Sequence, residues 1–431
     1  MSKSNPKHTP KTWYRLDLSA IVYPTLQRRD FSSVYRLSVL LKDPVQPDIL
    51  QQAVDIAMKR FPTYHSAMRK GFFWRYLEPN TRPGPFVKPD TRNFCMPMPF
   101  KSNNRYLVRF YWYDRRISLV AHHSLGDGTG GMYLLQTVTA VYLRLLGHEI
   151  SNGGFVLDVN ETPDPEEFED AYMRYANARV CPPRPAEKTY RVRGTKEPFY
   201  TLNVIDGIMS VSAVQKVAKQ YQASITEYLN AVLLYSLLQK QEHDFHLRLR
   251  PVRIAMPVNL RRFFPSKTLR NFITMVYPSI DPRLGDYTFE EIVTQVHHYM
   301  RYYINSKFLR GDITTNASTQ RNPLIRIVPL FLKDFVVRQF YQRVQDKNSS
   351  AGLTNMGAIR VPDDMKPYLE RFDIYMGIPY SQRTNCAIVS FEDTLTVNFA
   401  SCIIEADVER RFFQKLVEDG IPVTIESNRE L

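Results

Sequence analysis

The sequence has no run of about 18 apolar residues, so it predicts no membrane-spanning helix. Its first residues, "MSKSNPKHTPKTWYRLDLS", lack the apolar core of a secretory signal, and we therefore expect a cytoplasmic protein. No segment repeats at a fixed period, which argues against a solenoid or a propeller. No signature of a nucleic-acid-binding module occurs either, so we expect no nucleic-acid partner.

Cysteine is scarce, with four among 431 residues. The four lie far apart and form no C-x-x-C pair, which argues against a zinc knuckle and against a disulfide framework. None lies beside a histidine in the sequence, so a cysteine nucleophile has little support, and we interpret all four as small buried side chains. They are Cys95, Cys181, Cys386 and Cys402.

The charge balance is basic, with a formal net charge of +14 and a pI near 9.5. Such a surface can attract nucleic acid, anionic lipid, an acidic carrier protein or the phosphates of coenzyme A. The basic residues are spread along the chain instead of being gathered in one tail. Charge alone therefore does not choose the partner.

The length of 431 residues exceeds what one hydrophobic core usually supports, so two subdomains are expected. A stretch rich in proline and charge, residues 151–195, divides the chain into residues 1–150 and 196–431. Each half mixes strand-like and helix-like runs, which predicts an α/β (α+β) architecture of two subdomains, each with a mixed or antiparallel sheet and helices.

Several elements can be predicted from local patterns. In the first half we expect a strand over 34–41, a helix over 46–62 and one strand over 67–80. Two strand-like runs, "RYLVRFYWY" and "RISLVAHH", are joined by "DRR" and predict a β-hairpin. In the second half, Ser212 and Ser224 are candidate N-caps of two successive helices.

The segment after the hairpin, "HHSLGDGTGG" at residues 122–131, fits two patterns. Gly126, Gly128 and Gly131 fit G-x-G-x-x-G, a dinucleotide-binding turn, and Glu149 lies at about the spacing of a ribose ligand. An antiparallel hairpin does not provide the βαβ context that this fold requires, and Glu149 follows a helix instead of a strand. The nucleotide interpretation is therefore disfavoured.

The same segment fits H-H-x-x-x-D-G, with His123 as a general base at the end of a strand. A free imidazole has a pKa near ~6.5 and is largely neutral at pH 7, as a base must be. Asp127 can orient the loop through a buried ion pair, and His122 is expected to pack beside the site. The plainer alternative is a histidine paired with its own loop aspartate. His148 is the only other ligand candidate nearby, so no metal site is expected.

This motif, with its preceding hairpin and following helix, resembles the active site of the coenzyme-A-dependent acyltransferase superfamily. That superfamily includes chloramphenicol acetyltransferase and peptide condensation domains, and the resemblance spans nearly the whole chain. It implies two such subdomains with an active-site tunnel between them, His123 and Asp127 as the central residues, and Gly128 and His122 in support. "MPVNLRRFFPSKTLRNF" is similar to the segment whose arginine pairs with the motif aspartate. This assigns Arg261, with Arg262 as the neighbouring alternative, and Asn271. "LTNMGAIRVPDD" similarly assigns Asn355 and Gly357.

The resemblance is strongest to the alcohol acetyltransferase-like branch. It implies an acyltransferase that moves an acyl group from an acyl thioester, acyl-CoA as co-substrate, to a hydroxyl acceptor, a small molecule or a lipid, with no bound cofactor. The alternative is a non-catalytic or carrier-protein-dependent, condensation-like protein in natural-product or lipid assembly. An acyl carrier protein is then a partner. The chain lacks the D-F-G-W-G of the plant enzymes and any attached carrier domain. We expect a monomer.

One further segment, residues 321–344, interleaves basic with large apolar residues: "RNPLIRIVPLFLKDFVVRQFYQRV". We interpret it as a helix of the core with a solvated basic edge. The alternative is a helix that makes peripheral contact with a membrane surface, in which case the acceptor would be a lipid.

Overall fold

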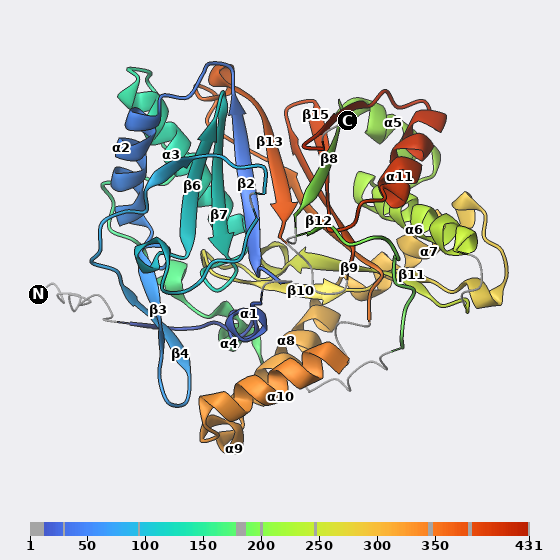
Figure 1. The fold of residues 1–431 in the computed structure, drawn as a ribbon, viewed down its shortest axis with the longest axis horizontal. Coiled ribbons are helices and arrows are strands. Elements are labelled where there is room, and N and C mark those ends of the chain that lie inside the picture. Colours follow the sequence, from blue (N-terminus) through green and yellow to red (C-terminus); the bar gives the residue numbers. More distant parts are fainter. Residues whose placement is uncertain are drawn as a thin grey trace, which may run out of the picture.

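The structure is a computed structural model that describes residues 13–28, 31–93, 95–177, 187–198, 201–244, 248–343, 348–377 and 382–429. Within them the chain folds into two α/β halves side by side, each built on its own large sheet (Figure 1). This confirms the predicted fold class.

The sheet of the first half has five strands, antiparallel except for the parallel pair β5 (Val87–Pro89) and β6 (Val108–Tyr113). The predicted hairpin is present as β6 and β7 (Arg116–His122), and the predicted strand over 34–41 is β2 (Val34–Leu41). Two helices cover this sheet: α2 (Pro47–Ala57) packs on α3 (Gly128–Leu145), which lies against β2 and β7. In spatial order the strands are β13 (Leu369–Met376), β2 (Val34–Leu41), β7 (Arg116–His122), β6 (Val108–Tyr113) and β5 (Val87–Pro89).

The expected single strand over 67–80 is wrong. The segment forms an antiparallel hairpin of β3 (Ser66–Lys70) and β4 (Arg75–Pro79), which pairs with the short β1 (Tyr14–Arg15). Gly71 begins the turn, where its backbone N–H donates to the carbonyl oxygen of Trp74 over 2.9 Å. An apolar turn made of aromatic residues concealed the chain reversal, because turns are usually recognised by polar residues.

The sheet of the second half is larger, and its strand β12 runs parallel to both neighbours. The other described pairs in this sheet are antiparallel. In spatial order the strands are β10 (Ile273–Val276), β9 (Val252–Asn259), β12 (Ala351–Ala358), β14 (Thr384–Phe391), β15 (Thr394–Ser401), β8 (Asn203–Ser210) and β16 (Thr424–Ser427), with β11 (Ser279–Ile280) also paired to β9.

The helices of the second half begin at recognisable caps. Ser224 caps α6 (Ile225–His243) in a capping box with Glu227, as predicted. The cap of α5 (Val211–Gln220) is Ser210, whose hydroxyl accepts from the Ala213 N–H, so the choice of Ser212 is wrong. The remaining helices are α1 (Val22–Leu26), α4 (Ala171–Tyr175), α7 (Phe289–Tyr303), α8 (Ser306–Arg321), α9 (Pro323–Arg326), α10 (Leu330–Arg343) and α11 (Asp407–Glu418).

Short 3-10 turns connect several of these elements, and one anchors the crossover between the halves. In that turn, Pro165–Phe168, the buried carboxylate of Glu167 accepts two hydrogen bonds from the guanidinium of Arg60, over 2.6 and 2.8 Å. The acidic run of the crossover is thus structural. The other such turns are Met58–Arg60, Asn103–Arg105, Leu260–Arg262, Pro282–Leu284 and Lys366–Tyr368.

Each half encloses a hydrophobic core, and the second half contributes one strand to the sheet of the first. β13 lies late in the sequence but pairs with β2 and completes the first sheet. The division into residues 1–150 and 196–431 stays a prediction. The topology shows in addition that β13, from the second of these segments, belongs to the sheet of the first. Cys95, Cys386 and Cys402 are buried, as expected, and Cys181 lies outside the described residues. No helix of the described part is long and apolar enough to cross a membrane.

Candidate functional site

The motif occupies the turn between β7 and α3, at the junction of the two halves. His122 is the last residue of β7, and its backbone N–H donates to the carbonyl oxygen of Leu107 over 2.9 Å. The N–H of His123 donates to the carbonyl oxygen of Ser33 over 3.0 Å. Both histidines are therefore fixed by main-chain contacts to neighbouring segments before any side chain is considered.

Two tyrosine rings pack on the His123 imidazole. The Tyr23 ring stacks on it with the centroids 4.6 Å apart and an angle of 16° between the planes. The Tyr35 ring lies tilted, with a centroid distance of 4.7 Å. The residue is half-buried, and its Nδ1 atom is buried with no hydrogen-bond partner among the described residues. A ring held in this way has little freedom to turn, which suits a group that must meet a reactant.

Burial lowers the pKa of His123 to about 4, against the opposing influence of Asp127, the Asn271 side chain and the Gly126 backbone. The charged form loses hydration in this environment, so the imidazole is neutral at pH 7. The pKa of His122 is lowered further, to about 3, by burial and by the adjacent His123. Both imidazoles are thus neutral at physiological pH.

His122 lies beside the site, as predicted. It is fully buried, its Nδ1 accepts from the Ser124 N–H over 3.2 Å, and its ring meets the edge of Phe100. Its Nε2 is buried and has no hydrogen-bond partner among the described residues.

Asn271 joins the second half to the base. Its Nδ2 donates to the carbonyl oxygen of His123 over 2.9 Å and to the carboxylate of Asp17, over 3.0 Å for the nearer oxygen. Asp17 is fully buried and also accepts from the Ala20 N–H. The Oδ1 atom of Asn271 is buried and, within the described ranges, unpaired. The structure therefore brings the predicted Asn271 to the motif, where it holds the chain on which the base sits.

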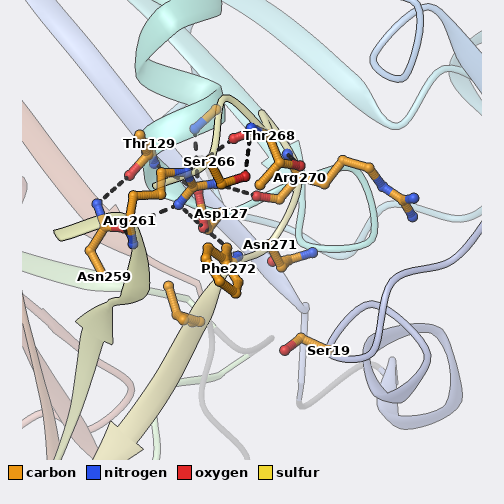
Figure 2. A network of polar contacts seen from close by, with 12 residues as sticks. Ser19, Asp127, Thr129, Asn259, Arg261, Ser266, Thr268, Arg270, Asn271 and Phe272 are labelled. Carbon is orange, nitrogen blue, oxygen red and sulfur yellow. Dashed lines mark hydrogen bonds and ion pairs between the residues drawn. The ribbon is translucent and has the colours of Figure 1, made fainter. Parts of the chain in front are cut away.

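The carboxylate of Asp127 serves two structural purposes at once (Figure 2). Oδ1 caps α3 by accepting from the N–H groups of Thr129 and Gly130, over 3.1 and 3.3 Å. Oδ2 accepts from Nη1 of Arg261 over 2.8 Å and from the Phe272 N–H over 2.9 Å. These four contacts direct both oxygens to the helix and to the second half, so the carboxylate does not pair with the His123 ring.

Arg261 is the partner of Asp127, as the resemblance implied, and the alternative, Arg262, is exposed. The Arg261 guanidinium also donates to the carbonyl oxygens of Thr268 and Arg270, which fixes the loop that carries Asn271 (Figure 2). A largely buried cation and a buried anion, with side chains 12% and 4% exposed, thus neutralise each other where the halves meet.

The glycines of the motif lie against protein, not against open space. A Cβ atom on Gly126 would lie 2.5 Å from the carbonyl oxygen of Leu269, and one on Gly130 only 1.9 Å from the same atom. One on Gly131 would meet the Tyr35 hydroxyl at 2.6 Å, and one on Gly128 the sulfur of Met356 at 2.9 Å. Small residues are required here because Leu269 and Met356 of the second half and Tyr35 of β2 pack directly on the turn.

This packing argues against the nucleotide interpretation. The space that a pyrophosphate would need is filled by backbone, and the start of α3 is already capped by the Asp127 carboxylate. Glu149 is exposed beyond the far end of α3, which at 18 residues is about 27 Å long by the usual helix rise.

Asn355 and Gly357 lie at a bulge of β12. Gly357 has φ of +75°, a conformation that favours glycine, and its N–H donates to Oδ1 of Asn355 over 2.7 Å. Nδ2 of Asn355 donates to the Thr226 hydroxyl at the start of α6 over 2.8 Å. The described contacts do not join Asn355 to His123.

The most important residues missed in the sequence are Tyr23, Tyr35 and Asp17. They come from α1, β2 and the segment before α1, all distant from the motif in sequence, and no spacing could have indicated them. The described ranges contain no group of three or more histidine, cysteine or acidic side chains placed to hold a metal ion.

Comparison with models of protein families finds no match, and comparison with curated proteins finds none. Solved structures do resemble the chain. Trichothecene 15-O-acetyltransferase from Fusarium sporotrichioides is 13% identical, with a TM-score of 0.58 over 97% of this chain and 99% of that one. The starter condensation domain of rhizomide synthetase, solved with C8-CoA, is 12% identical, with a TM-score of 0.59 over 94% of each chain.

Wax ester synthase/diacylglycerol acyltransferase from Marinobacter aquaeolei VT8 is 11% identical, with a TM-score of 0.56 over 94% of this chain and 100% of that one. At such identities the likeness establishes the fold. The chain has the two-subdomain fold that these solved acyltransferases and condensation domains share, as the resemblance in its sequence predicted.

Proposed function

We propose that this protein transfers an acyl group from an acyl thioester, acyl-CoA in the first instance, to a hydroxyl acceptor, with His123 as the general base. The observation that carries the proposal is the state of His123. It is a neutral imidazole, half-buried at the junction of the halves and packed by Tyr23 and Tyr35. The fold shared with solved acyltransferases supports the same class of reaction.

The proposed step begins with the base in its neutral form. The acceptor hydroxyl gives its proton to Nε2 of His123 as its oxygen bonds to the thioester carbonyl carbon. The tetrahedral adduct then collapses, its C–S bond breaks, and the departing thiolate takes the proton back from the imidazole. A base placed in this way typically contributes about 100- to 10,000-fold to the rate.

The assignment of Nε2 rests on the surroundings of the other ring nitrogen. Nδ1 is buried and has no hydrogen-bond partner among the described residues, so it is not the nitrogen open to a reactant. A proton kept on Nδ1 leaves the lone pair on Nε2, which is the form a base requires.

Asp127 and Arg261 are proposed as positioning residues, because their charged atoms are occupied by each other and by backbone. Asn355 is proposed to donate to the oxyanion of the adduct. Its Nδ2 carries two protons, and Thr226 accepts one of them. The loss of one oxyanion donor usually costs roughly 3 to 4 kcal/mol.

Acyl-CoA is the proposed donor for two reasons. The net charge of +14 favours an anionic coenzyme, and the rhizomide condensation domain of the same fold was solved in complex with C8-CoA. A carrier-bound donor is the second candidate, because polyketide synthase associated protein 5 from Mycobacterium tuberculosis also shares the fold, with a TM-score of 0.56 at 14% identity.

The test is thiol release from a panel of acyl-CoAs, with and without a pool of alcohols. We expect slow release by the wild type, stimulation by acceptor, and loss of both in His123→Ala. His148→Ala is the matched control, because His148 is a half-buried histidine beyond α3 and should leave the rate unchanged. If wild type and His123→Ala released thiol equally, His123 would not be the base. Release from acyl-carrier thioesters alone would favour the second candidate.

A further inference from the structure

The polarity of α10 is the reverse of that of an ordinary surface helix. Phe331 and Phe335 are both 62% exposed, whereas Asp334, which lies between them, is turned toward the protein. Its carboxylate accepts from Thr25 of α1 and from the guanidinium of Arg75 of β4. A helix that packs on a core normally buries its apolar side and exposes its charges. The expectation that residues 321–344 form a core helix is therefore wrong for its described part.

The exposed apolar surface extends to a second element. The tip of the β3–β4 hairpin carries Phe72, which is 69% exposed, followed by Phe73 and Trp74. The two elements are joined, because the N–H of Leu330 donates to the carbonyl oxygen of Phe72 over 2.8 Å. We call this surface the α10 face. Its exposed apolar members are Phe72, Phe73, Trp74, Leu324, Ile325, Ile327, Phe331, Leu332, Phe335, Val336 and Phe340.

The charge of the α10 face is positive. Asp334 is the only acidic residue between Gln320 and Arg343, and it is paired with Arg75. The cations of the same segment make their described contacts with backbone carbonyl oxygens. Because a carbonyl group carries no net charge, these contacts do not neutralise the cations. They include Arg321, Arg326, Lys333 and Arg338.

We propose that the α10 face binds the surface of a lipid bilayer that carries anionic headgroups. A surface of large aromatic and aliphatic side chains interleaved with arginine and lysine suits the boundary between headgroups and acyl chains. A soluble chain rarely exposes so many large apolar residues together without a partner. The cations favour an anionic bilayer over a second copy of this basic chain, which would bring like charges together.

The position of the α10 face links it to the site. α10 contacts α1 through Asp334 with Thr25 and through Arg338, which donates to the carbonyl oxygen of Thr25. α1 also carries Tyr23, which stacks on His123. A bilayer on this face would thus lie one short helix from the proposed base. The binding itself does not depend on the proposed acyl transfer.

The test is co-sedimentation with two kinds of vesicle, phosphatidylcholine alone and phosphatidylcholine with phosphatidylglycerol. The wild type should sediment with the anionic vesicles, and about tenfold less with the neutral ones or in 0.5 M salt. The double variant Phe331→Ser/Phe335→Ser should lose binding by tenfold or more. The matched control is Leu284→Ser/Tyr113→Ser, which removes two side chains that are 79% and 66% exposed elsewhere.

Three results would overturn the proposal. The first is a wild type that stays in the supernatant with anionic vesicles. The second is a Phe331→Ser/Phe335→Ser variant that sediments like the wild type. The third is sedimentation velocity that gives a dimer, reduced to a monomer by that double variant, which would assign the α10 face to a second copy. Thiol release from water-soluble substrates is measured on the same variants. It reports on the proposed acyl transfer alone, so a failure of bilayer binding can be told apart from a failure of acyl transfer.

Discussion

Nη1 of Arg261 donates to Oδ2 of Asp127 over 2.8 Å, which fastens the second half of the chain to the turn that carries His123. The same carboxylate oxygen accepts from the Phe272 N–H, and the other oxygen caps α3. One side chain thus fixes the start of the helix after the motif and the junction of the two halves. The catalytic proposal depends on this geometry, because His123 lies on the same turn.

Replacing Asp127 by alanine should lower both the stability of the fold and the activity. The change leaves the Arg261 guanidinium, whose side chain is 12% exposed, without its anion, which costs at most the roughly 3 to 5 kcal/mol typical of a fully buried pair. Chemical unfolding should show a lower midpoint with an unchanged slope. Asp127→Asn keeps an oxygen for the cap of α3 but loses the charge. Its unfolding midpoint should therefore lie between those of the wild type and Asp127→Ala.

A double-mutant cycle with Arg261→Ala isolates the pair. Because each single variant strands the other charge, the double variant should be less destabilised than the sum of the singles. Asp127→Ala with unchanged unfolding and full activity would contradict the structural assignment.

The pH dependence of the proposed transfer should reflect a shifted histidine. With the pKa of His123 lowered to about 4, the imidazole is protonated, and inactive as a base, only below that pH. The acid limb of kcat/KM should therefore lie near pH 4, not near the ~6.5 of a free imidazole. Initial rates of thiol release from pH 3.5 to 8 measure this, with circular dichroism at each pH to show that the fold persists. A half-maximal rate at pH 6.5 would mean that the base is solvated.

Gly130 should not tolerate even a methyl group. Its Cβ would lie 1.9 Å from the carbonyl oxygen of Leu269 and 2.9 Å from the Tyr64 hydroxyl, so the halves would have to separate. Overpacking of this kind costs typically 1–3 kcal/mol, so Gly130→Ala should melt at a lower temperature than the wild type. Gly153→Ala is the control, because the nearest described atom there is Cγ of Pro362 at 3.9 Å. Equal melting of the two variants would show that the turn can move.

The parts of the site that could be predicted from the sequence are those that lie close together in it. His123 and Asp127 are four residues apart on a turn, and the hairpin before them is marked by two strand-like runs joined by the short polar "DRR". Arg261 could be assigned only by resemblance, since no local pattern distinguishes it from Arg262. Tyr23 and Tyr35 could not be predicted, because their contact with His123 arises from tertiary packing alone.

Apolar patterns misled the predictions in two places, once on the environment of a helix and once on a turn. Residues 321–344 were expected in the core because large apolar residues are normally buried there. A bilayer favours the same side chains, so composition does not distinguish the two environments. The β3–β4 hairpin was missed because its tip, Phe72–Phe73–Trp74, is aromatic where a turn is normally polar. Both errors fall on the α10 face.

A pair of buried carboxylates outside the site should make stability depend on pH. Burial, with the neighbouring Asp373, raises the pKa of Asp206 on β8 to about 7. Its oxygens accept from Nδ2 of Asn398 and from the Tyr375 hydroxyl, over 2.8 and 2.9 Å. The folded-state pKa exceeds that of the unfolded chain, near 3.8, so the folded state binds more protons between these values. Stability from this group is therefore present below about pH 4 and is lost as pH rises to 7.

The expected slope is at most about 1.4 kcal/mol per pH unit for one proton, and Asp206→Asn should abolish it, because the amide is neutral throughout. The buried histidines act in the opposite direction, since lowered pKa values make stability rise between about pH 4 and 6.5. The quantity to compare is thus the difference in unfolding free energy between wild type and Asp206→Asn at pH 4.5, 5.5 and 6.5. The unfolding free energy of the wild type minus that of Asp206→Asn should decrease as pH rises. A constant difference would mean that Asp206 is ionised in the folded protein, with its charge balanced by the guanidinium groups nearby.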